Sequence, residues 1–294
     1  MKHVAFLSMS DLGDFFVYDD LLIPFFEKAG WQVTSVPWRD TTDWDQFDAV
    51  IVRSPWDYQQ SPEAFLQCLR GIEASRAYLD NPLPLMEWNL HKTYLKDMEA
   101  KGVITLPTRW ETGYNLATVT EAFSEFSTDT LIVKPVLSAN ADDTFRLSRE
   151  EAHRRETALQ TLYRDRKIMI QPFVEEVLTE GEYSLFYFDG QYSHAILKTP
   201  KSGDFRVQEE HGGALQPVIP DATMLQACTR ALEAMPTDSL YARVDLISYQ
   251  NAWAIMELEL IEPSLYFNLD SASQPRFVDA FLRRYAASAG QARA

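Results

Sequence analysis

The sequence predicts an α/β protein in which the later part of the chain forms lobes of the α+β type. Over the first ~80 residues, short apolar strand patterns alternate with helical patterns, which is typical of a parallel sheet flanked by helices. Farther along, strand patterns follow one another through short turns, which is typical of antiparallel hairpins. The 294 residues, 46% of them hydrophobic, suffice for two or three compact lobes.

The N-terminal part is expected to alternate between strands and helices. Strands are predicted at residues 3–9, 31–38 and 48–58, and helices at 17–30 and 61–75. The first helix ends at Gly30, and the second begins with Ser61 as N-cap and Pro62 in its first turn. No GxGxxG motif follows the first strand, which argues against a dinucleotide-binding fold. Residues 79–90, rich in proline and asparagine, are predicted to form a domain boundary.

The remaining elements are short helices and hairpins. Helices are predicted at residues 91–103, 115–126, 150–165, 220–236 and 274–287. Strands are predicted at residues 106–111, within 130–148, at 167–177 with a break at Pro172, and at 182–200, 241–248 and 252–260. The Asp189-Gly190 pair is the strongest hairpin signal in the chain.

The hairpin of residues 241–260, here called the acidic hairpin, carries three carboxylates that are expected on one face. Side chains alternate along a strand, so Glu257 and Glu259 share one face, roughly 6.5–7 Å apart, while Met256 lies on the other. If the strands turn within the segment YQN, Asp245 lies opposite Glu257. Such a cluster of like charges is unfavourable unless a cation binds to it.

Two interpretations of the acidic hairpin remain open at this point. Hard cations such as Mg²⁺ or Mn²⁺ prefer oxygen ligands, and Mg²⁺ is commonly held by one or two carboxylates together with substrate phosphates. That chemistry predicts a metal–nucleotide site. The alternative is a solvated acidic strand in a protein that is acidic throughout.

The overall charge limits the classes of partner. Lys and Arg number 27 against 43 Asp and Glu, a formal charge of −16, which argues against nucleic acid and anionic membranes as partners. No uncharged apolar window reaches membrane-spanning length, and the first residues turn acidic too early for a signal peptide. The two cysteines, Cys68 and Cys228, have no metal-binding spacing. We therefore expect a soluble cytoplasmic protein.

Four motifs occur in a characteristic order. They are "NLHKTYL" at residues 89–95, "LIVKP" at 131–135, "IMIQPFVEE" at 168–176 and the acidic hairpin. In this order the chain resembles the ATP-grasp superfamily, and in particular the glutathione-synthetase-like carboxylate–amine ligases, a group that includes the cycloserine-pathway cyclo-ligase. The resemblance covers most of the chain and is strongest over residues 89–266.

The resemblance implies an ATP site with defined nucleotide contacts. Lys92 and Lys134 match the two lysines that contact the phosphates in this family. Taken singly, each has the alternative interpretation of an ordinary exposed lysine. The segment of Gln171, Phe173 and Val174 matches the hinge that contacts adenine. Glu182, or else Glu175, is the candidate for the ribose hydroxyls.

The resemblance also implies a metal set and a loop near the reacting groups. Asp245, Glu257 and Glu259 match the acids that hold two Mg²⁺ ions, with Mn²⁺ as an alternative ion; Glu259 stands where the family often has asparagine. In "KTPKSGDFRVQEEHGG", residues 198–213, Arg206 is the candidate for contact with the phosphoryl group in transfer or with a substrate carboxylate, and Lys198 is a second candidate. A plain solvated loop is the alternative.

One loop departs from the family pattern. The family covers the phosphates with a glycine-rich loop, because backbone amides must approach them closely. Residues 138–144 read "SANADDT", with no glycine and two aspartates. Ser138 is small enough for close approach, but Asp142 and Asp143 would repel phosphate unless they point away.

Substrate contacts are expected at two further places. Arg53 and Ser54 lie at the C-terminal end of the third predicted strand, where open α/β sheets bind ligands, although a structural loop is the alternative. Glu262 and Ser264 follow the acidic hairpin, where the family loop approaches the acceptor substrate. The acid and the amine themselves are not specified by the sequence.

The resemblance implies an ATP-grasp fold with an N-terminal Rossmann-like domain over residues 1–88. The ATP-grasp domain would cover 89–294, with a lid at about 89–172 and a large subdomain at about 173–294. The implied activity is ATP- and Mg²⁺-dependent joining of a small-molecule carboxylate to an amine through an acyl phosphate. The alternative is an inactive nucleotide-binding module of the same fold. The family is often dimeric, which permits a homodimer here.

Overall fold

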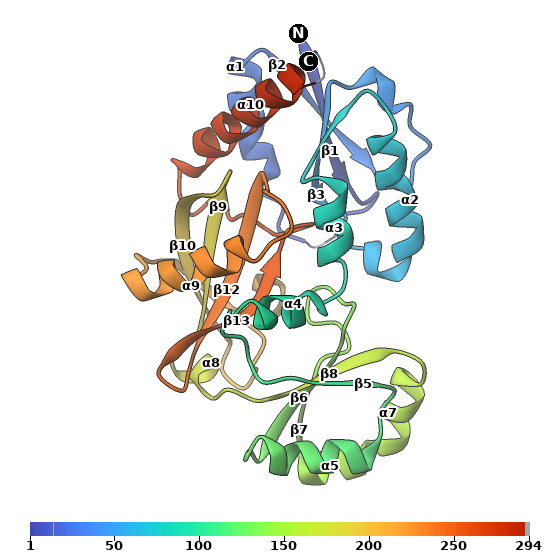
Figure 1. Ribbon diagram of the computed structural model, residues 1–294, viewed down its shortest axis with the longest axis vertical. Coiled ribbons are helices and arrows are strands. Elements are labelled where there is room, and N and C mark those ends of the chain that lie inside the picture. Colours follow the sequence, from blue (N-terminus) through green and yellow to red (C-terminus); the bar gives the residue numbers. More distant parts are fainter. Residues whose placement is uncertain (14, 292–294) are drawn as a thin grey trace.

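The computed structural model describes residues 1–13 and 15–291 and contains three sheets stacked along the long axis of the molecule (Figure 1). The N-terminal sheet lies at one end, a five-stranded sheet lies in the middle, and a small four-stranded sheet lies at the other end. This mixture of a parallel sheet and antiparallel sheets confirms the predicted α/β class. In the described part of the chain, no helix is both long and apolar enough to span a membrane.

The N-terminal sheet is parallel and has the order β2-β1-β3-β4. Its elements are β1 (Lys2–Ser8), β2 (Trp31–Pro37), β3 (Ala49–Ser54), β4 (Tyr78–Asp80), α1 (Ile23–Lys28) and α2 (Pro62–Glu73). Every residue of β3 is buried, as expected for a central strand that is covered on both faces. Pro62 starts α2 as predicted, but the Ser61 side chain makes no capping hydrogen bond.

The segment predicted as a boundary, residues 79–90, is ordered structure. It contains the end of β4 and helix α3 (Leu83–Asn89), which the sequence analysis missed. Proline occupies the residue before α3 and its first turn, where no backbone N–H is required. The buried Asn81 amide donates hydrogen bonds to the carbonyls of Tyr241 and Leu260. The prolines of this segment therefore lie at the start of a helix, and its Asn81 joins two sheets. The domain division at residue 88 stays a prediction.

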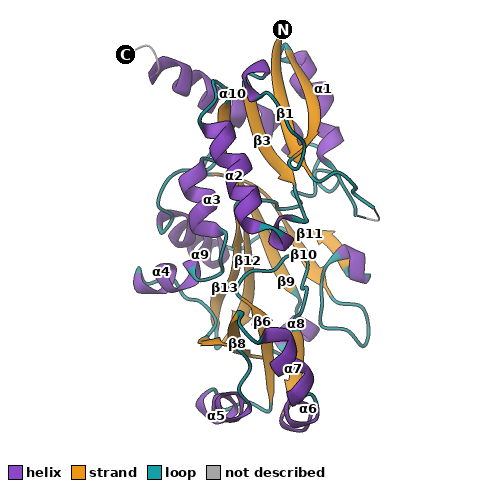
Figure 2. Cartoon of the chain, turned by 90° about the vertical axis from the view of Figure 1, so that its right-hand side faces the viewer, coloured by secondary structure: helices purple, strands orange, loops and turns teal. Residues whose placement is uncertain are grey.

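The small sheet is antiparallel with the order β5-β8-β6-β7. Its strands are β5 (Arg109–Thr112), β6 (Thr130–Pro135), β7 (Phe145–Ser148) and β8 (Lys167–Pro172), and the helices in its core are α5 (Leu116–Glu125), α6 (Arg149–Arg154) and α7 (Glu156–Tyr163). Helix α4 (Tyr94–Ala100) packs instead against the central sheet. The helix predicted at 150–165 is in fact two helices that meet at Arg155. Figure 2 shows α5, α6 and α7 gathered at the end of the molecule far from β1.

The central sheet is antiparallel with the order β11-β10-β9-β12-β13. Its elements are β9 (Glu182–Phe188), β10 (Gln191–Thr199), β11 (Ala214–Pro217), β12 (Tyr241–Tyr249), β13 (Ala252–Glu259), α8 (Glu176–Thr179) and α9 (Ala222–Glu233). Asp189 and Gly190 have φ of 50° and 72°, as the predicted two-residue hairpin requires. β12 and β13 form the predicted acidic hairpin.

The last helix, α10 (Ser273–Gln291), returns to the N-terminal sheet (Figure 1). Phe281 is fully buried and packs against Phe26 and Trp31, with ring centroids 5.2 and 5.0 Å away. The end of the chain therefore belongs to the same hydrophobic core as its beginning.

Candidate active site

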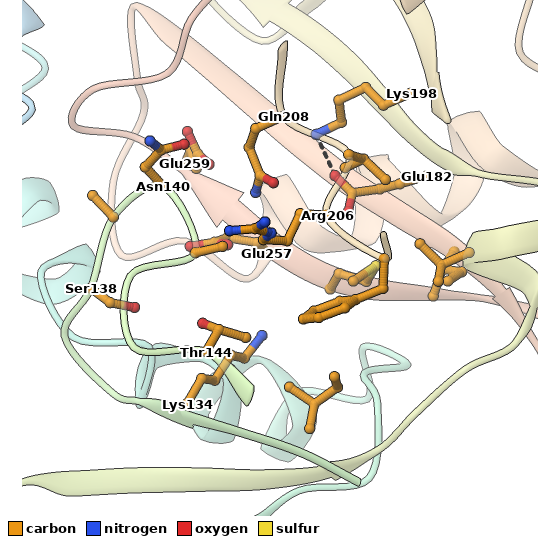
Figure 3. Close-up of a pocket in the computed structure, with 18 of the residues that line it drawn as sticks. Lys134, Ser138, Asn140, Thr144, Glu182, Lys198, Arg206, Gln208, Glu257 and Glu259 are labelled. Carbon is orange, nitrogen blue, oxygen red and sulfur yellow. Dashed lines mark ion pairs between the residues drawn. The ribbon is translucent and has the colours of Figure 1, made fainter. Parts of the chain in front are cut away.

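One cavity lies between the central and small sheets, and it brings together most of the predicted site residues (Figure 3). The predicted residues in its lining are Lys92, Lys134, Ser138, Gln171, Phe173, Val174, Glu182, Lys198, Arg206, Glu257, Glu259, Glu262 and Ser264. Asp245 lies behind this surface, in contact with lining residues. Arg53 and Ser54 lie outside it.

The alternation of β6 explains why Lys134 reaches the cavity. Leu131 and Val133 are fully buried in the core of the small sheet, whereas Ile132 and Lys134 point the other way and line the cavity. Burial lowers the pKa of Lys134, and Glu257 opposes that shift. The strand therefore presents one ammonium group to a largely desolvated cavity.

Lys92 lies just before α4, and its ammonium connects the small sheet to the acidic hairpin. Its Nζ donates to the Ser138 carbonyl at 3.1 Å and contacts Glu257 Oε1 at 2.5 Å. Burial lowers the pKa of Lys92, but the combined attraction to Glu257, Glu259 and Glu262 raises the pKa overall.

The acidic hairpin pairs as predicted, with Asp245 opposite Glu257. The register shifts next to this pair, so that Leu246 faces Ile255 and Met256 is an extra residue in β13. Such a bulge changes which side chains share a face. Met256 and Glu257 therefore both line the cavity, and the prediction that Met256 would lie on the opposite face was wrong.

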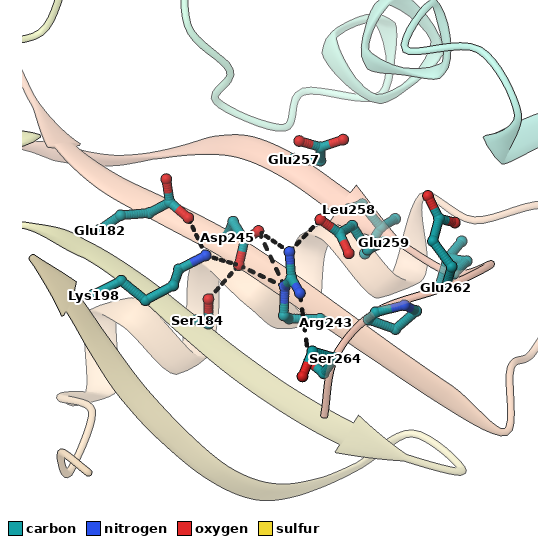
Figure 4. Close-up of polar contacts among 12 residues, drawn as sticks. Glu182, Ser184, Lys198, Arg243, Asp245, Glu257, Leu258, Glu259, Glu262 and Ser264 are labelled. Carbon is teal, nitrogen blue, oxygen red and sulfur yellow. Dashed lines mark hydrogen bonds and ion pairs between the residues drawn. The ribbon is translucent and has the colours of Figure 1, made fainter. Parts of the chain in front are cut away.

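The carboxylates of the hairpin form an alternating chain of charges with basic side chains (Figure 4). Arg243 contacts Asp245, with Nη2 3.0 Å from Oδ2, and also pairs with Glu259. Lys198 lies 3.4 Å from Asp245 and pairs with Glu182, and Ser184 donates to Asp245. Lys198 and Arg243 thus offset part of the negative charge at the floor of the cavity.

No group of three or more His, Cys, Asp or Glu side chains arranged to hold a metal ion is found in residues 1–13 and 15–291. Asp245, Glu257 and Glu259 are each paired with a lysine or an arginine. The donor chemistry nevertheless fits Mg²⁺, since all three donors are carboxylate oxygens. Burial raises the pKa of Glu259 to about 8; Arg243 opposes this shift, and repulsion from Glu257 and Asp245 adds to it.

Apolar side chains form the wall of the cavity near β8. Phe173, Val174 and Met256 belong to one hydrophobic cluster there, and the Gln171 amide donates to Thr108 at 2.9 Å. Glu182 is buried and lines the cavity.

Of the two acids predicted for the ribose, only Glu182 is placed in the cavity. Glu175 is exposed and pairs with Arg146. Of the two candidates, Glu182 therefore has the side chain that lines the cavity, and its contact with ribose stays a prediction.

The loop of residues 200–213 covers the cavity from the side of the central sheet. Arg206 lines the cavity and pairs with Asp204 at 2.7 Å, and the Gln208 amide points toward the interior in Figure 3. At Gly213, a Cβ atom would overlap the carbonyl oxygen of Val207, so the tight fold of the loop requires glycine there.

Arg53 is held in a structural contact. It is 1% exposed, and its Nη2 donates to Asp19 at 2.8 Å and to the Pro263 carbonyl at 3.2 Å. The neighbouring carbonyls of Glu262 and Ser264 accept from Trp56, at 2.8 Å, and from Arg243, at 3.4 Å. These contacts fix the segment that presents the Glu262 and Ser264 side chains to the cavity.

Arg243 is the main site residue that the sequence analysis missed. It lies two residues before Asp245, so both side chains share one face of β12, and that spacing in "YARVD" was the available signal. Its guanidinium lines the cavity between Glu259 and Ser264. A planar guanidinium suits the binding of carboxylate or phosphoryl oxygens.

Comparisons with known proteins are consistent with this geometry. The family model described as D-cycloserine synthetase DcsG, N-terminal domain, matches residues 4–81. The cycloserine biosynthesis protein DcsG of Streptomyces lavendulae is 32% identical over 266 residues, covering 84% of this chain and 87% of that protein.

Solved structures agree with the sequence relationship. The crystal structure of D-cycloserine synthetase DcsG superposes with a TM-score of 0.86 at 28% identity, covering 96% of this chain and 99% of that chain. The ATP-grasp ligase PsnB, solved in complex with a minimal precursor, has a TM-score of 0.67 at 14% identity, covering 96% and 99%, and shares the fold.

Proposed function

The chain belongs to the DcsG-like group of ATP-grasp carboxylate–amine ligases, and we propose that it activates a small-molecule carboxylate as an acyl phosphate for attack by an amine. The observation that carries this proposal is the convergence of Lys92 and Lys134 with Glu257 and Glu259 in one cavity, from the loop before α4, from β6 and from β13. The relationship to a synthetase favours a working ligase over an inactive nucleotide-binding module.

In the proposed nucleotide pose, the adenine lies against Phe173, Val174 and Met256, and the ribose hydroxyls donate to Glu182. The triphosphate then extends toward the ammonium groups of Lys134 and Lys92. Asp245, Glu257 and Glu259 would hold Mg²⁺, or Mn²⁺, which supplies positive charge to the phosphate oxygens when bound. The shared cavity supports these placements for the residues that line it, and Asp245 is included because it contacts the lining residues Lys198 and Arg243.

The proposed chemistry has two steps. A carboxylate oxygen of the substrate attacks the γ-phosphorus of ATP, and the bond from that phosphorus to the bridging oxygen breaks, giving an acyl phosphate and ADP. The amine nitrogen then attacks the acyl carbon and loses a proton, while the carbon–oxygen bond to phosphate breaks. Arg243, Arg206 and Lys198 are the residues proposed to stabilise the charge on the transferred group.

The substrate proposed here carries both reacting groups. One relative is named a D-cycloserine synthetase, and cycloserine is a cyclic molecule, so we place ring closure within one amino-acid-like substrate ahead of joining two substrates. Glu262 and Ser264 are proposed to contact that substrate, because they line the cavity beside Arg243.

Product analysis tests this proposal. The protein is incubated with ATP, Mg²⁺ and a panel of amino-acid-like carboxylates, and ADP and products are measured by mass spectrometry. The proposal predicts ADP release that depends on the added acid, together with a product formed from one substrate molecule. A product that contains two substrate molecules would contradict ring closure, and a failure to bind ATP would contradict the proposed function as a whole.

A further inference from the structure

The loop of residues 138–144, here called the phosphate loop, achieves close approach to the cavity without glycine. Asn140, Ala141 and Asp143 have φ of 49°, 57° and 51°, a left-handed conformation that side chains other than glycine disfavour. Backbone hydrogen bonds within the loop, from Asp142 to Ala139 and from Thr144 to Ala141, and contacts from outside the loop together hold it in this conformation.

Two residues at the end of α7 and the following turn hold Asp143. The hydroxyl of the fully buried Tyr163 donates to the Asp143 carbonyl at 2.5 Å and to the Val133 carbonyl at 3.3 Å. Arg166 Nη1 lies 2.5 Å from Asp143 Oδ2. Both the backbone and the side chain of Asp143 are thus fixed from the side of the loop away from the cavity.

The same contacts decide which side chains of the loop face the cavity. Ser138, Ala139, Asn140, Ala141 and Thr144 line it, whereas Asp142 and Asp143 do not. Figure 3 shows Ser138, Asn140 and Thr144 along the wall opposite Gln208 and Arg206. Asp142 and Asp143 do not face the cavity, so the predicted repulsion between these aspartates and a bound phosphate is avoided.

We propose that Arg166 and Tyr163 are positioning residues for the triphosphate, since they hold the phosphate loop in shape and keep the Asp143 charge away from the nucleotide. The inference rests on the proposed function, in which ATP binds in this cavity. Arg166 and Tyr163 do not line the cavity, so they act through the loop. Loss of either side chain should therefore weaken the binding of ATP, through its phosphates, and leave the binding of adenosine unchanged.

The test compares Arg166→Gln with wild type by calorimetric titration of ATP with Mg²⁺ and, separately, of adenosine. The expected result is an ATP affinity lower by at least about tenfold, because Asp143 is released from its ion pair, with adenosine affinity unchanged. Tyr163→Phe, which keeps the ring and removes only the hydroxyl, is expected to change ATP affinity in the same direction.

Two further variants separate positioning from general damage. Arg164→Gln removes the same charge from an exposed neighbour that makes no ion pair with the described loop residues, and it should bind ATP like wild type. Adding Asp143→Asn to Arg166→Gln removes the released charge and should restore most of the ATP affinity.

Each remaining outcome has a definite meaning. Unchanged ATP affinity in Arg166→Gln, equal losses of ATP and adenosine affinity, or an equal loss in Arg164→Gln would overturn the positioning role. A wild-type protein that binds no ATP would instead overturn the proposed function.

Discussion

Lys92 and Lys134 line the same cavity but differ in what surrounds them. Lys92 contacts Glu257 and is fixed by the Ser138 carbonyl, whereas Lys134 has no carboxylate within ion-pair distance among the described residues. A buried ammonium without a carboxylate partner is costly, and burial accordingly lowers its pKa. Lys134 is therefore the cation best placed to gain from a bound phosphate.

Replacing Lys134 with Met tests this assignment, because Met keeps much of the apolar stem. We expect ATP affinity to fall roughly 10- to 150-fold, the equivalent of a charge-assisted hydrogen bond of about 1.5–3 kcal/mol, with adenosine affinity unchanged. Calorimetric titration of both ligands measures the effect, and Lys167→Met, at an exposed lysine of the same sheet, serves as the control. Equal losses for ATP and adenosine would remove Lys134 from the phosphate site.

Glu262 gives a prediction about pH. Burial raises the pKa of Glu262 from its ordinary 4.5 to about 7 in the protein without metal or nucleotide, although Tyr58 and Lys92 lower it in part. The pKa of Glu262 is higher in the folded protein than in the unfolded chain, so protonation of Glu262 stabilises the folded state. This contribution to the free energy of unfolding is complete below about pH 4.5 and is lost as the pH rises through about 7.

Glu262→Gln removes this titration. The free energy of unfolding of the variant, relative to wild type, should therefore rise between pH 5 and pH 8 when urea unfolding is measured with EDTA present. Glu210→Gln, at an exposed carboxylate that also lines the cavity, is the matched control. A difference between Glu262→Gln and wild type that stays constant over this range would refute the burial argument.

The acidic hairpin shows what a sequence pattern can and cannot specify for one element. Its two strands, its tight turn and the Asp245–Glu257 pairing were predictable, because the side-chain period and the turn length set the register. The bulge at Met256 was not predictable, since one extra residue leaves no signature in an apolar strand. Arg243 was not predicted to be a site residue, because a metal site is identified by its acidic ligands and an arginine between them is not part of that pattern.

The Arg53–Asp19 pair links β3, the segment before α1 and the Pro263 carbonyl. Asp19→Ala leaves the buried guanidinium without its counter-charge, so we expect a loss of about 3–5 kcal/mol in the free energy of unfolding. Glu87→Ala, which breaks an exposed pair with Arg70, should cost only about 0–1 kcal/mol. Urea unfolding of both variants checks the contrast, and similar losses would show that burial of the Arg53 pair is not decisive.

Over the whole molecule, local patterns predicted a parallel N-terminal sheet and later antiparallel hairpins, but they predicted neither the division into three sheets nor the contacts between these sheets. Residues 79–90 were predicted to be a domain boundary because they contain two prolines and two asparagines, yet Asn81 is buried between two sheets. The return of α10 to the N-terminal core depends on contacts distant in sequence, which no local period encodes. The same holds for Arg53, whose partners lie 34 and 210 residues away.

Phe281→Ala tests how much the packing of α10 against the N-terminal sheet contributes to stability. The side chain is fully buried against Phe26 and Trp31, so its removal should cost about 3–5 kcal/mol of the free energy of unfolding. Arg283→Ala, at an exposed residue of the same helix, is expected to have little effect. A near-neutral Phe281→Ala variant would mean that α10 contributes little to the N-terminal core.

The central claim is that the acidic hairpin and the two lysines form a magnesium–nucleotide site. The most direct test is a thermal-shift titration of wild type and Glu257→Ala with ATP and ADP, each with and without Mg²⁺. A ligand that binds only the folded state raises the melting temperature by mass action. We expect a Mg²⁺-dependent increase in the melting temperature of wild type that is lost in Glu257→Ala. An absence of any shift in wild type, or an equal shift in both proteins, would contradict a magnesium–nucleotide site at the acidic hairpin.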